Sequence, residues 1–486
     1  MESLEPPYEI LGELDKPHEE CGVTGVLVLD EDIHVAKLIG EGLQSLQHRG
    51  QEAAGVAVSV SREGQTERNI EPLKNVGLVQ DVMGGYQLDG MPLGKMAIGH
   101  VRYGTMQGIP EHKRLQAAGP FICETEHGPI AVAHNGHINN PDEIRNKYDL
   151  EFDEHATDSA IIAEAIAKSF NGKSLEHALV DVLSMASGAF SIVVMGDNKL
   201  IGVRDPFGFR PLMLGSYADG GKAIASEVPA IRAMGASYRR EISRGEMVVC
   251  NADGSMTTTY PFEEQPSRLC SFELIYFSAP HGELEGRSIH MVRKRMGEIL
   301  AKEHPVDADV VIGVPDSGIP ASEGYAQASG IPRVSGLMKN KYLSKARTFI
   351  VPGQENREAA VSKKLQVVGP EVYGKRIVLV DDSIVRGTTN KKIVAMLRDE
   401  GASEVHLRIS SSPYLNPCYY GMDTRNPDEL IANKFRDLQQ LTEYLDVDSL
   451  EYLSINGLRA AAADAAGKLC MACMDGKYPT PIPSKP

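Results

Sequence analysis

The chain is 486 residues long, which at about 150 residues per domain indicates more than one domain. It has 50 Lys and Arg against 66 Asp and Glu, a formal net charge of −16, and so lacks the basic excess with which proteins neutralise nucleic-acid phosphates. No apolar run approaches the roughly 20 residues that cross a bilayer. We therefore expect a soluble protein that binds neither nucleic acid nor membrane.

The N-terminal segment, residues 1–20, is acidic and has neither the basic nor the apolar region of a secretory signal. The chain contains 7 cysteines at irregular spacing, which does not resemble a disulfide framework. These features predict a cytoplasmic protein whose thiols serve other purposes than disulfide bonding.

Short β-rich runs alternate with helical patterns in the first half of the chain, which predicts an α+β sandwich. The expected strands are residues 21–30, 53–60, 190–196 and 200–204, and the expected helices are residues 35–47, 158–170 and 175–187.

A polar stretch at residues 251–268 suits a domain junction, and the pattern after it is α/β. Strand–helix–strand units of this kind build a parallel sheet whose ligands bind beyond the carboxyl ends of the strands. The expected strands are residues 309–314, 376–380 and 404–409, the expected helices are residues 321–330 and 388–401, and two further helical stretches are expected at 427–445 and 447–468.

The stretch RIVLVDDSIVRGTT, residues 376–389, contains an apolar strand that ends in two carboxylates, Asp381 and Asp382. Burying both would be costly without cations or hydroxyl partners. Gly387 lets the backbone approach a ligand closely, and the threonines after it open a helix whose N–H groups and dipole suit a phosphate. An isolated Asp-Asp pair is more often a turn, but the whole stretch favours a phosphate-binding loop.

This stretch resembles the phosphoribosyl pyrophosphate (PRPP) motif of type I phosphoribosyltransferases. The resemblance implies that Asp381 and Asp382 hold the ribose hydroxyls and one Mg²⁺ per subunit, with Ser317 of the loop 314–318 completing the metal site. The residues implied to surround the 5′-phosphate are Ser383, Val385, Arg386, Gly387, Thr388 and Thr389.

The segment 339–364 lies between these two loops in the sequence and is basic. On its own, a basic loop is usually a solvated surface. Between two phosphate sites it resembles the mobile loop that closes over PRPP in this enzyme class, with Lys341 as a substrate-binding residue.

Cys21 directly follows the acidic leader, and a single Cys before a strand is usually a buried hydrophobe. Four polar signatures, three of which contain glycine, come after it. In order and spacing they resemble the class II glutamine amidotransferases, which implies an α+β N-terminal-nucleophile hydrolase sandwich followed by an α/β type I phosphoribosyltransferase domain with a parallel sheet. The signatures are HRGQEAAG (48–55), GHVRYGT (99–105), AHNGHINN (133–140) and TDS (157–159).

The same resemblance makes Cys21 the nucleophile that attacks glutamine. Its own α-amine, with an ordinary pKa near 8, would be the base, so the leader would be a propeptide and the chain a zymogen. Arg102 would bind the carboxylate of glutamine, Asp158 its amino group, and the Asn135 amide and Gly136 N–H would form an oxyanion hole. Taken singly, these residues also fit a surface ion pair, a helix N-terminal charge and a hairpin turn.

Glutaminase signatures followed by a PRPP motif are similar to the amidophosphoribosyltransferase family, which are glycosyltransferases. The family implies that ammonia passes through an interior channel to PRPP and gives 5-phosphoribosylamine, glutamate and pyrophosphate, the first step of de novo purine (IMP) biosynthesis. It also implies purine nucleotide inhibitors and a homotetramer. The implied domains are a propeptide at 1–20, a class II glutamine amidotransferase domain at 21–265, and a phosphoribosyltransferase domain with C-terminal helices and a Cys-containing tail at 266–486.

One branch of this family holds a [4Fe–4S] cluster, one per subunit, with four cysteines that this chain matches: Cys270, Cys418, Cys470 and Cys473. A zinc ion accepts the same ligands and is the alternative. Cys123 and Cys250 fall outside this set and are expected to be structural.

The chain departs from the usual family motifs at several places. It has TDSA for TDSE (157–160), DPFGFRP for DPxGIRP (205–211) and YFSAPHG for YFARPDS (276–282), and its basic loop is longer, with Ser362 in place of a basic residue. We expect these changes to affect PRPP affinity, loop closure and the coupling between sites more than the type of reaction.

Overall fold

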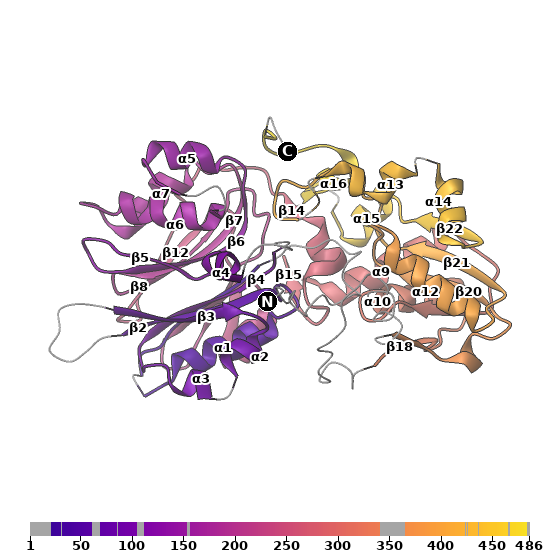
Figure 1. Ribbon diagram of the computed structural model, residues 1–486, viewed down its shortest axis with the longest axis horizontal. Helices are drawn as coiled ribbons and strands as arrows, with labels where there is room; N and C mark the ends of the chain where they lie inside the picture. Colours follow the sequence, from indigo (N-terminus) through magenta and orange to yellow (C-terminus); the bar gives the residue numbers. More distant parts are fainter. Residues whose placement is uncertain are drawn as a thin grey trace, which may run out of the picture.

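Two β-sheets lie face to face in the N-terminal half of the chain, and helices cover the outer side of each (Figure 1). The computed structural model describes residues 21–30, 32–60, 69–84, 86–104, 111–152, 156–340, 365–422, 424, 426–435, 437–464 and 467–483.

The first sheet has seven antiparallel strands with β1 at its centre, between β10 and β4. Its strands, in spatial order, are β11 (Ser237–Glu241), β9 (Met213–Ser216), β10 (Lys222–Ala225), β1 (Gly22–Leu27), β4 (Met96–Arg102), β2 (Ala53–Val60) and β3 (Asn69–Val76). The helices on its outer side are α1 (Val35–Ser45), α2 (Val79–Met83), α3 (Tyr86–Asp89) and α8 (Val228–Ala233).

The second sheet has six antiparallel strands. In spatial order they are β13 (Met256–Thr259), β12 (Met247–Asn251), β8 (Lys199–Arg204), β7 (Gly188–Gly196), β6 (Ile130–Ile138) and β5 (Phe121–Cys123). The helices α5 (Pro141–Lys147), α6 (Asp158–Ser169) and α7 (Leu175–Leu183) pack on its outer side, and α4 (Glu111–Gln116) precedes β5.

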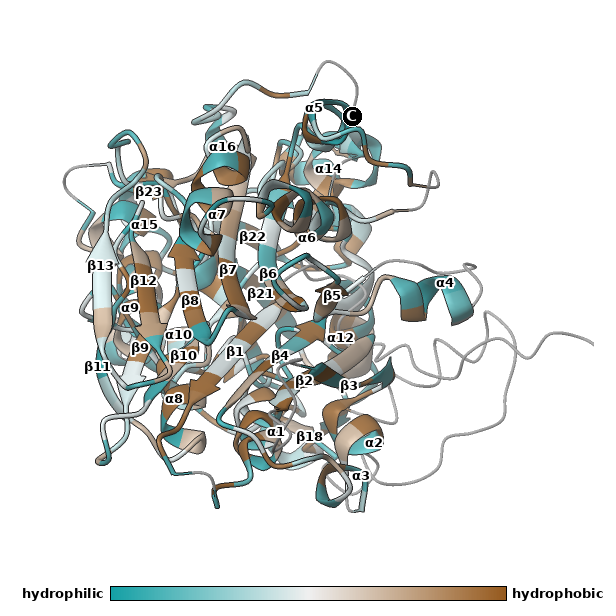
Figure 2. Ribbon diagram, turned by 90° about the vertical axis from the view of Figure 1, so that its left-hand side faces the viewer, coloured by the Kyte–Doolittle hydropathy of each residue, from teal (hydrophilic) through white to brown (hydrophobic). Residues whose placement is uncertain are grey.

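Apolar side chains from both sheets fill the space between them, among them Val23 and Ile98 of the first sheet and Ala133 and Val193 of the second. Strands buried on both faces read as continuous apolar runs, which is why β1 and β7 are clear in the sequence, and Figure 2 shows them as largely hydrophobic. The predicted α+β sandwich is confirmed.

The polar stretch at 251–268, which we interpret as a domain junction, contains the strand β13. All four residues of β13 are exposed, so the strand shows no alternation of apolar and polar residues. Its threonines fit a pleated edge strand, and Met247 pairs with Thr259.

The C-terminal half contains a four-stranded parallel sheet with helices on both faces (Figure 1), as predicted. Its strands, in spatial order, are β17 (Val310–Gly313), β20 (Arg376–Asp381), β21 (Glu404–Ile409) and β22 (Ser449–Tyr452). The larger helices are α9 (Ile289–Glu303), α10 (Ile319–Ser329), α12 (Thr388–Asp399), α14 (Leu438–Leu445) and α15 (Ile455–Ala461).

The two helical stretches predicted near the C-terminus are only partly correct. Residues 447–468 contain β22 before the short α15, because Ser449 pairs with His406 and Leu450 joins the sheet's core. Residues 427–445 are divided into η3 (Pro427–Glu429), α13 (Ile431–Lys434) and α14, and Asp446, with a φ of +59°, ends α14.

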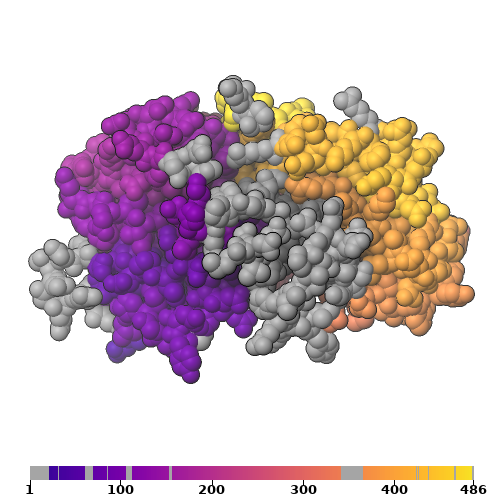
Figure 3. All heavy atoms as spheres, viewed as in Figure 1, coloured from indigo at the N-terminus to yellow at the C-terminus, as the bar shows by residue number. Residues whose placement is uncertain are grey.

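The two halves appear side by side in the space-filling view (Figure 3), and the elements not yet named are short. None of the helices in the described ranges is long and apolar enough to span a bilayer. The short elements are β14 (Leu269–Cys270), the π-helix η1 (Glu273–Phe277), β15 (Glu283–Leu284), β16 (Arg287–Ser288), β18 (Leu337–Lys339), β19 (Leu365–Val367), η2 (Gly369–Glu371), β23 (Leu469–Cys470) and α16 (Ala472–Asp475).

Candidate active sites

Cys21 and Arg102 lie level with each other at one end of the first sheet. Gly22 of β1 pairs with Val101 of β4, so the residue before Gly22 stands beside the last residue of β4. Cys21 is half-buried, as a reactive thiol that must meet a substrate has to be. Strand pairing therefore brings together two predicted residues that are far apart in the sequence.

Asn135 and Gly136 are neighbours on β6 of the second sheet. Asn135 has a side-chain donor without a partner among the described residues, and the backbone conformation at Gly136 requires glycine. The Asn135 side chain is 1% exposed, and its buried Nδ2 has no hydrogen-bond partner in the described structure. Gly136 has a φ of +146°, and a β-carbon there would lie 2.1 Å from the carbonyl oxygen of Ala189. An unpaired buried donor is costly, so it marks a place where an acceptor is expected.

Asp158 begins α6, where the Thr157 side chain caps the helix by accepting from Ala160 N–H. Its Oδ2 accepts from the N–H of Ile138 at 2.9 Å, which ties α6 to the end of β6. Burial alone would raise the pKa of Asp158, but the hydrogen bond and charge of His137, with Nδ1 3.4 Å from Oδ2, lower it below its usual range. Asp158 is therefore a half-buried anion beside the oxyanion candidates.

Arg102 donates from Nη1 to Oε2 of Glu52 at 2.6 Å, and both side chains are largely buried. Gly104 leaves room for the pair, because a β-carbon there would lie 2.2 Å from Glu52 Oε2. Burial raises the pKa of Glu52, and Arg102 opposes this. The predicted carboxylate-binding arginine thus already faces one carboxylate.

Two buried histidines support this site, and the sequence did not single them out. His134 shares a hydrogen bond of 2.9 Å with Ser159, next to Asp158, and His100 Nε2 lies 3.0 Å from the carbonyl oxygen of His134. Burial lowers the pKa of His134 and lowers that of His100 to about 3. Both histidines occur within the signatures GHVRYGT and AHNGHINN, but the sequence alone does not show that their rings are buried.

Asp381 and Asp382 lie at the carboxyl end of β20, in the middle of the parallel sheet, and are 0% and 1% exposed. Asn390 Nδ2 donates to Asp381 Oδ2 at 2.9 Å, and the Ser383 hydroxyl donates to Asp382 Oδ1 at 2.5 Å. As predicted, the burial of this acidic pair is accompanied by hydrogen-bond donors. Asp382 also interacts electrostatically with the buried Arg293.

The predicted phosphate loop turns at Gly387, whose φ of +82° begins α12. A β-carbon on Gly387 would lie 2.0 Å from Ile431 Cδ1, so glycine is required there. Thr388 is exposed and Thr389 is buried.

The other two predicted phosphate residues are tied to the chain around α13. Val385 is buried, and its carbonyl oxygen accepts from Ile431 N–H at 2.8 Å. Arg386 is half-buried and bonds Glu429 at 2.9 Å. A cavity of about 420 Å³ adjoins Arg386 and Thr388.

The loop 314–318 lies beside the acidic pair because Val314 N–H donates to the carbonyl of Val380 at 2.9 Å. Ser317 is half-buried in this loop, and a β-carbon on Gly318 would lie 2.5 Å from the Val380 carbonyl oxygen. The two predicted loops therefore meet at one edge of the sheet. Lys341 and Ser362 lie outside the described residues, between the paired strands β18 and β19.

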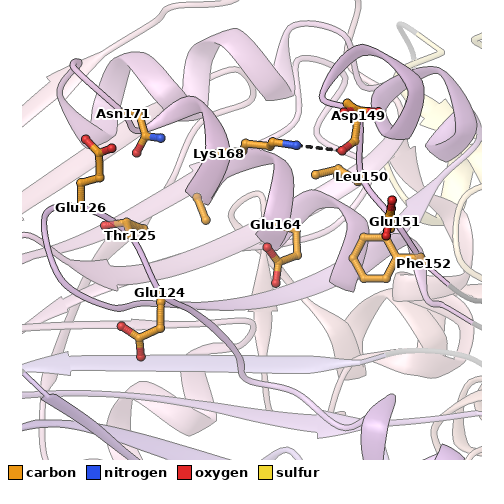
Figure 4. Close-up of a pocket in the computed structure, with 11 residues that line it drawn as sticks. Glu124, Thr125, Glu126, Asp149, Leu150, Glu151, Phe152, Glu164, Lys168 and Asn171 are labelled. Atoms are coloured by element: carbon orange, nitrogen blue, oxygen red, sulfur yellow. Dashed lines mark hydrogen bonds between the residues drawn. The ribbon is translucent and has the colours of Figure 1, made fainter.

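A separate groove of about 860 Å³ lies on the outer helical layer of the N-terminal half and contains none of the predicted site residues. Acidic side chains dominate its lining, and Lys168 of α6 donates to the carbonyl of Asp149 at 2.7 Å (Figure 4). The acidic residues are Glu124, Glu126, Asp149, Glu151 and Glu164.

Four cysteines gather where the two halves meet. Cys270 of β14 pairs level with Cys470 of β23, and the carbonyl oxygen of Cys473 accepts from Leu415 N–H at 2.8 Å, near Cys418. Each of the four is 7–8% exposed, and Cys473 interacts electrostatically with the other three.

None of the seven cysteines, all of which the structure describes, forms a disulfide bond. Burial, with Cys270 adding to it, raises the pKa of Cys418 to about 11, and burial also raises the pKa values of Cys470 and Cys473. Within the described ranges, no group of three or more His, Cys, Asp or Glu side chains is arranged as ligands of one metal ion. Cys123 and Cys250 are buried separately in β5 and β12.

A buried ion network joins the two halves and is absent from the sequence-based interpretation. Arg49, which is 2% exposed, bonds Glu227 through Nε and bonds Glu273 through Nη2 at 2.7 Å. Glu273 also accepts from the Ser278 hydroxyl at 2.6 Å, and Arg293 donates to the carbonyl of Ser278 at 2.7 Å. Residues of the HRGQ and YFSAPHG motifs are thus in direct contact across the domain junction.

Residues 112–233 match the glutamine amidotransferase domain family, and residues 284–431 match the phosphoribosyl transferase domain family. The amidophosphoribosyltransferase of Synechococcus elongatus is 42% identical over 477 residues, 97% of this chain and 93% of that protein. The chain belongs to the amidophosphoribosyltransferase family. It is therefore a glycosyltransferase that combines a glutamine amidotransferase domain with a phosphoribosyltransferase domain, as the sequence predicts.

Further relatives agree with this assignment. The amidophosphoribosyltransferase of Methanocaldococcus jannaschii is 41% identical over 95% of this chain and 98% of that protein. A solved structure of the allosteric regulatory enzyme of purine biosynthesis superimposes with a TM-score of 0.86 at 39% identity, covering 96% of this chain and 97% of that one. The glutamine PRPP amidotransferase from B. subtilis, complexed with ADP and GMP, gives a TM-score of 0.85 at 39% identity, covering 96% and 98%.

Proposed function

We propose that the chain releases ammonia from glutamine at Cys21 and transfers it to PRPP held at the 381–389 loop. The products would be 5-phosphoribosylamine, glutamate and pyrophosphate. The observation that carries this assignment to residues is the unpaired, buried amide of Asn135, which stands on β6 beside a glycine that nothing larger could replace. Such a donor fits the developing oxyanion of an attacked amide.

At the glutaminase site, the thiolate of Cys21 would attack the amide carbon while Asn135 Nδ2 and the Gly136 N–H receive the negative oxygen. The α-amine of Cys21 would take the thiol proton, so the leader of residues 1–20 must be removed first. Arg102 would bind the glutamine carboxylate by exchanging its bond to Glu52.

Asp158 would bind the ammonium group of glutamine. Its depressed pKa keeps it ionised at neutral pH, which suits a cationic partner. His137 Nδ1 lies 3.4 Å from the same carboxylate, so glutamine would share Asp158 with this ring.

At the transferase site, Asp381 and Asp382 would hold the ribose hydroxyls, and the turn at Gly387 would direct backbone N–H groups toward the 5′-phosphate. Arg386, now bonded to Glu429, would add charge to that phosphate. Lys341, from the segment that the structure does not describe, would complete the substrate contacts.

Mg²⁺ fits this donor set, because it prefers carboxylate and hydroxyl oxygens together with substrate phosphates. Asp381, Asp382 and Ser317 would hold it, and the ion would neutralise charge on the pyrophosphate leaving group. The two carboxylates are buried and already oriented by Asn390 and Ser383, so they need little rearrangement to bind.

The four buried cysteines would hold a [4Fe–4S] cluster, as in one branch of the family, and zinc is the alternative. A single zinc ion holds its sulfur ligands about 2.3 Å from its centre, so all four must converge on one point. The four thiols interact electrostatically with one another, and four thiolates are what a [4Fe–4S] cluster needs. The buried Ser271 hydroxyl, next to Cys270, also lacks a partner among the described residues.

Coupling between the sites would require that ammonia travel inside the protein, because protonated ammonia is not a nucleophile. The segment 273–279 contacts Arg49 and Glu227 on the glutaminase side and Arg293 on the other, so it borders the route that we propose. We also propose a cytoplasmic homotetramer inhibited by purine nucleotides. The B. subtilis structure complexed with ADP and GMP supports the nucleotide part of this proposal.

Replacement of Cys21 tests the two-site assignment. Cys21→Ala should abolish phosphoribosylamine formation from glutamine and leave formation from added ammonia intact. Cys123→Ala, a buried thiol of the same domain, is the matched control and should keep both activities. Equal loss of both activities in Cys21→Ala, or full glutamine use by protein that mass analysis shows to retain residues 1–20, would contradict the proposal.

A further inference from the structure

Asn390 is a polar residue on the buried face of α12, the helix that begins at the predicted phosphate loop. It is 2% exposed, and the residues that follow it on this face belong to the core beside the parallel sheet: Ile393, Val394 and Leu397. A buried amide costs free energy unless it is hydrogen-bonded, and Nδ2 of Asn390 donates to Oδ2 of Asp381 at 2.9 Å. The helix that begins at the phosphate loop is therefore bonded to one carboxylate of the acidic pair.

Asp381 is fully buried and is held at both oxygens of its carboxylate. Its Oδ1 accepts from the N–H of Asp382 at 2.8 Å, while its Oδ2 accepts from Asn390. The main chain is held as well, because the carbonyl oxygen of Asp381 accepts from Ser410 N–H at 2.9 Å. A carboxylate shielded from solvent takes its direction from protein donors such as these.

The two donors to Asp381 differ in what they connect. The N–H of Asp382 belongs to the next residue, whereas Asn390 lies 9 positions along the chain, in the first turn of α12 after Gly387. Side chains of a helix lean toward its N-terminus, so that of Asn390 reaches back to the end of β20 and closes the loop between strand and helix. The direction of the Asp381 carboxylate therefore depends on where α12 begins.

We propose that Asn390 is a positioning residue of the transferase site, which aims the Asp381 carboxylate at a ribose hydroxyl of PRPP and ties it to the phosphate loop. This inference rests on the proposed PRPP site. A carboxylate accepts several hydrogen bonds, so Asp381 can keep the Asn390 donor while it accepts from the sugar. A carboxylate that could turn would bind the sugar more weakly, because its orientation would have to be fixed on binding. Asn390 should thus strengthen recognition of the ribose hydroxyls without changing recognition of the phosphate.

The test separates hydroxyl recognition from phosphate recognition with two ligands of the full-length purified protein. Ribose 5-phosphate has the ring hydroxyls, whereas 2,3-dideoxyribose 5-phosphate keeps the ring and the phosphate but lacks the hydroxyls at positions 2 and 3. Isothermal titration calorimetry gives the two dissociation constants, and their ratio, which we call the hydroxyl preference, reports on these hydroxyls.

Three variants are compared with the unmodified protein. Asn390→Leu removes the donor at similar size, and Asn390→Ser keeps a shorter hydroxyl donor. Tyr325→Phe is the matched control, because Tyr325 of α10 is fully buried and donates to the carbonyl oxygen of His304 at 3.0 Å, where α9 ends. It removes one hydrogen bond of the same domain that does not involve the acidic pair.

Asn390→Leu should bind ribose 5-phosphate about 10–100-fold more weakly and the dideoxy sugar phosphate within about twofold of the unmodified protein, because only the aim of Asp381 is lost. Asn390→Ser should keep a larger hydroxyl preference than Asn390→Leu, and Tyr325→Phe should keep the full preference. An unchanged preference in Asn390→Leu, or equal weakening of both ligands, would overturn the inference. If circular dichroism shows that Asn390→Leu does not fold, Asn390→Asp, which has the same shape but lacks the amide donor, is judged by the same ratio.

The unmodified protein distinguishes this inference from the proposed function. If it prefers ribose 5-phosphate but forms no phosphoribosylamine from PRPP and ammonia, the proposed function fails, and the hydroxyl preference of Asn390→Leu still decides the inference. If the unmodified protein binds both sugar phosphates equally, the assignment of the acidic pair to the ribose fails, and the inference fails with it.

Discussion

Asn135 offers the sharpest test of the glutaminase site, because its role in stability and its role in catalysis should separate. Its Nδ2 is buried without a partner in the described structure, so the folded protein gains no hydrogen bond from it. An unsatisfied buried donor costs about 1–3 kcal/mol. Asn135→Ala removes that cost and loses some packing, so the free energy of unfolding should change by less than about 1 kcal/mol.

The catalytic effect should be much larger. If Nδ2 donates to the developing oxyanion, its loss should raise the activation barrier by about 2.7–4 kcal/mol, which lowers kcat for glutamine hydrolysis about 10²–10³-fold. KM for glutamine should change little, because the donor is aimed at the transition state rather than at the substrate. Phosphoribosylamine formation from added ammonia should be unaffected.

Asn140 is the matched control. It lies five positions further along the same segment, and its amide donates to Glu143 and to the carbonyl of Met185 while its oxygen accepts from Ser187 N–H. Asn140→Ala should therefore lose stability by about 1–3 kcal/mol and keep its glutaminase kcat. Glutamate release and urea unfolding measure the two effects. A loss of less than about tenfold in Asn135→Ala, where one oxyanion donor is normally worth far more, would refute the reasoning.

Three further predictions follow from local geometry. Gly387→Ala should destabilise the protein by about 1–3 kcal/mol and weaken PRPP saturation, whereas Gly330→Ala, at a similar φ of +77° but in open space, should cost less in urea unfolding and keep PRPP affinity. Burial lowers the pKa of His100 from 6.5 to about 3, so the ring stays neutral in the folded protein while it takes up a proton in the unfolded chain below pH 6.5. The free energy of unfolding should therefore fall by about 2 kcal/mol between pH 7 and pH 5 because of this residue. In denaturant unfolding, His100→Gln should lose correspondingly less stability over the same pH range. Arg102→Ala should raise KM for glutamine by about tenfold or more in glutamate-release assays, since a carboxylate pairing is lost; an unchanged KM would remove Arg102 from the substrate site.

The fold class was predictable because several of its strands are buried on both faces and so have a recognisable sequence pattern. Strands buried on both faces, such as β1, β7 and β20, are continuous apolar runs and are recognised without knowledge of their partners. The exposed β13 and the short β22 carry no such pattern. Their strand conformation comes from pairing with β12 and β21, which local sequence does not encode.

The candidate site residues were predictable in a different way, from motifs that combine unusual residues at fixed spacing. Asn135-Gly136 and Asp381-Asp382 follow or interrupt apolar strands. An unpaired amide, a glycine or two adjacent carboxylates would destabilise such a strand unless they served a ligand. Contacts between distant motifs were not predictable. Nothing in the letters indicates that Glu52 faces Arg102, although the two residues belong to adjacent signatures.

The sequence predicts a domain boundary at residue 265, but buried side chains on the two sides of this boundary are in direct contact. Arg49 and Glu273 are 224 positions apart and fully buried together, and Arg210 spans the same boundary to the Tyr420 carbonyl. Removing one member of a buried ion pair costs about 3–5 kcal/mol, because the other charge stays uncompensated. A glutaminase fragment without residues 266–486 would take Glu273 away from Arg49, which keeps Glu227, and would take the Tyr420 carbonyl away from Arg210. The buried network crosses the domain boundary that the sequence predicts. It thus helps to hold the two active sites at a fixed distance and orientation, on which ammonia transfer depends.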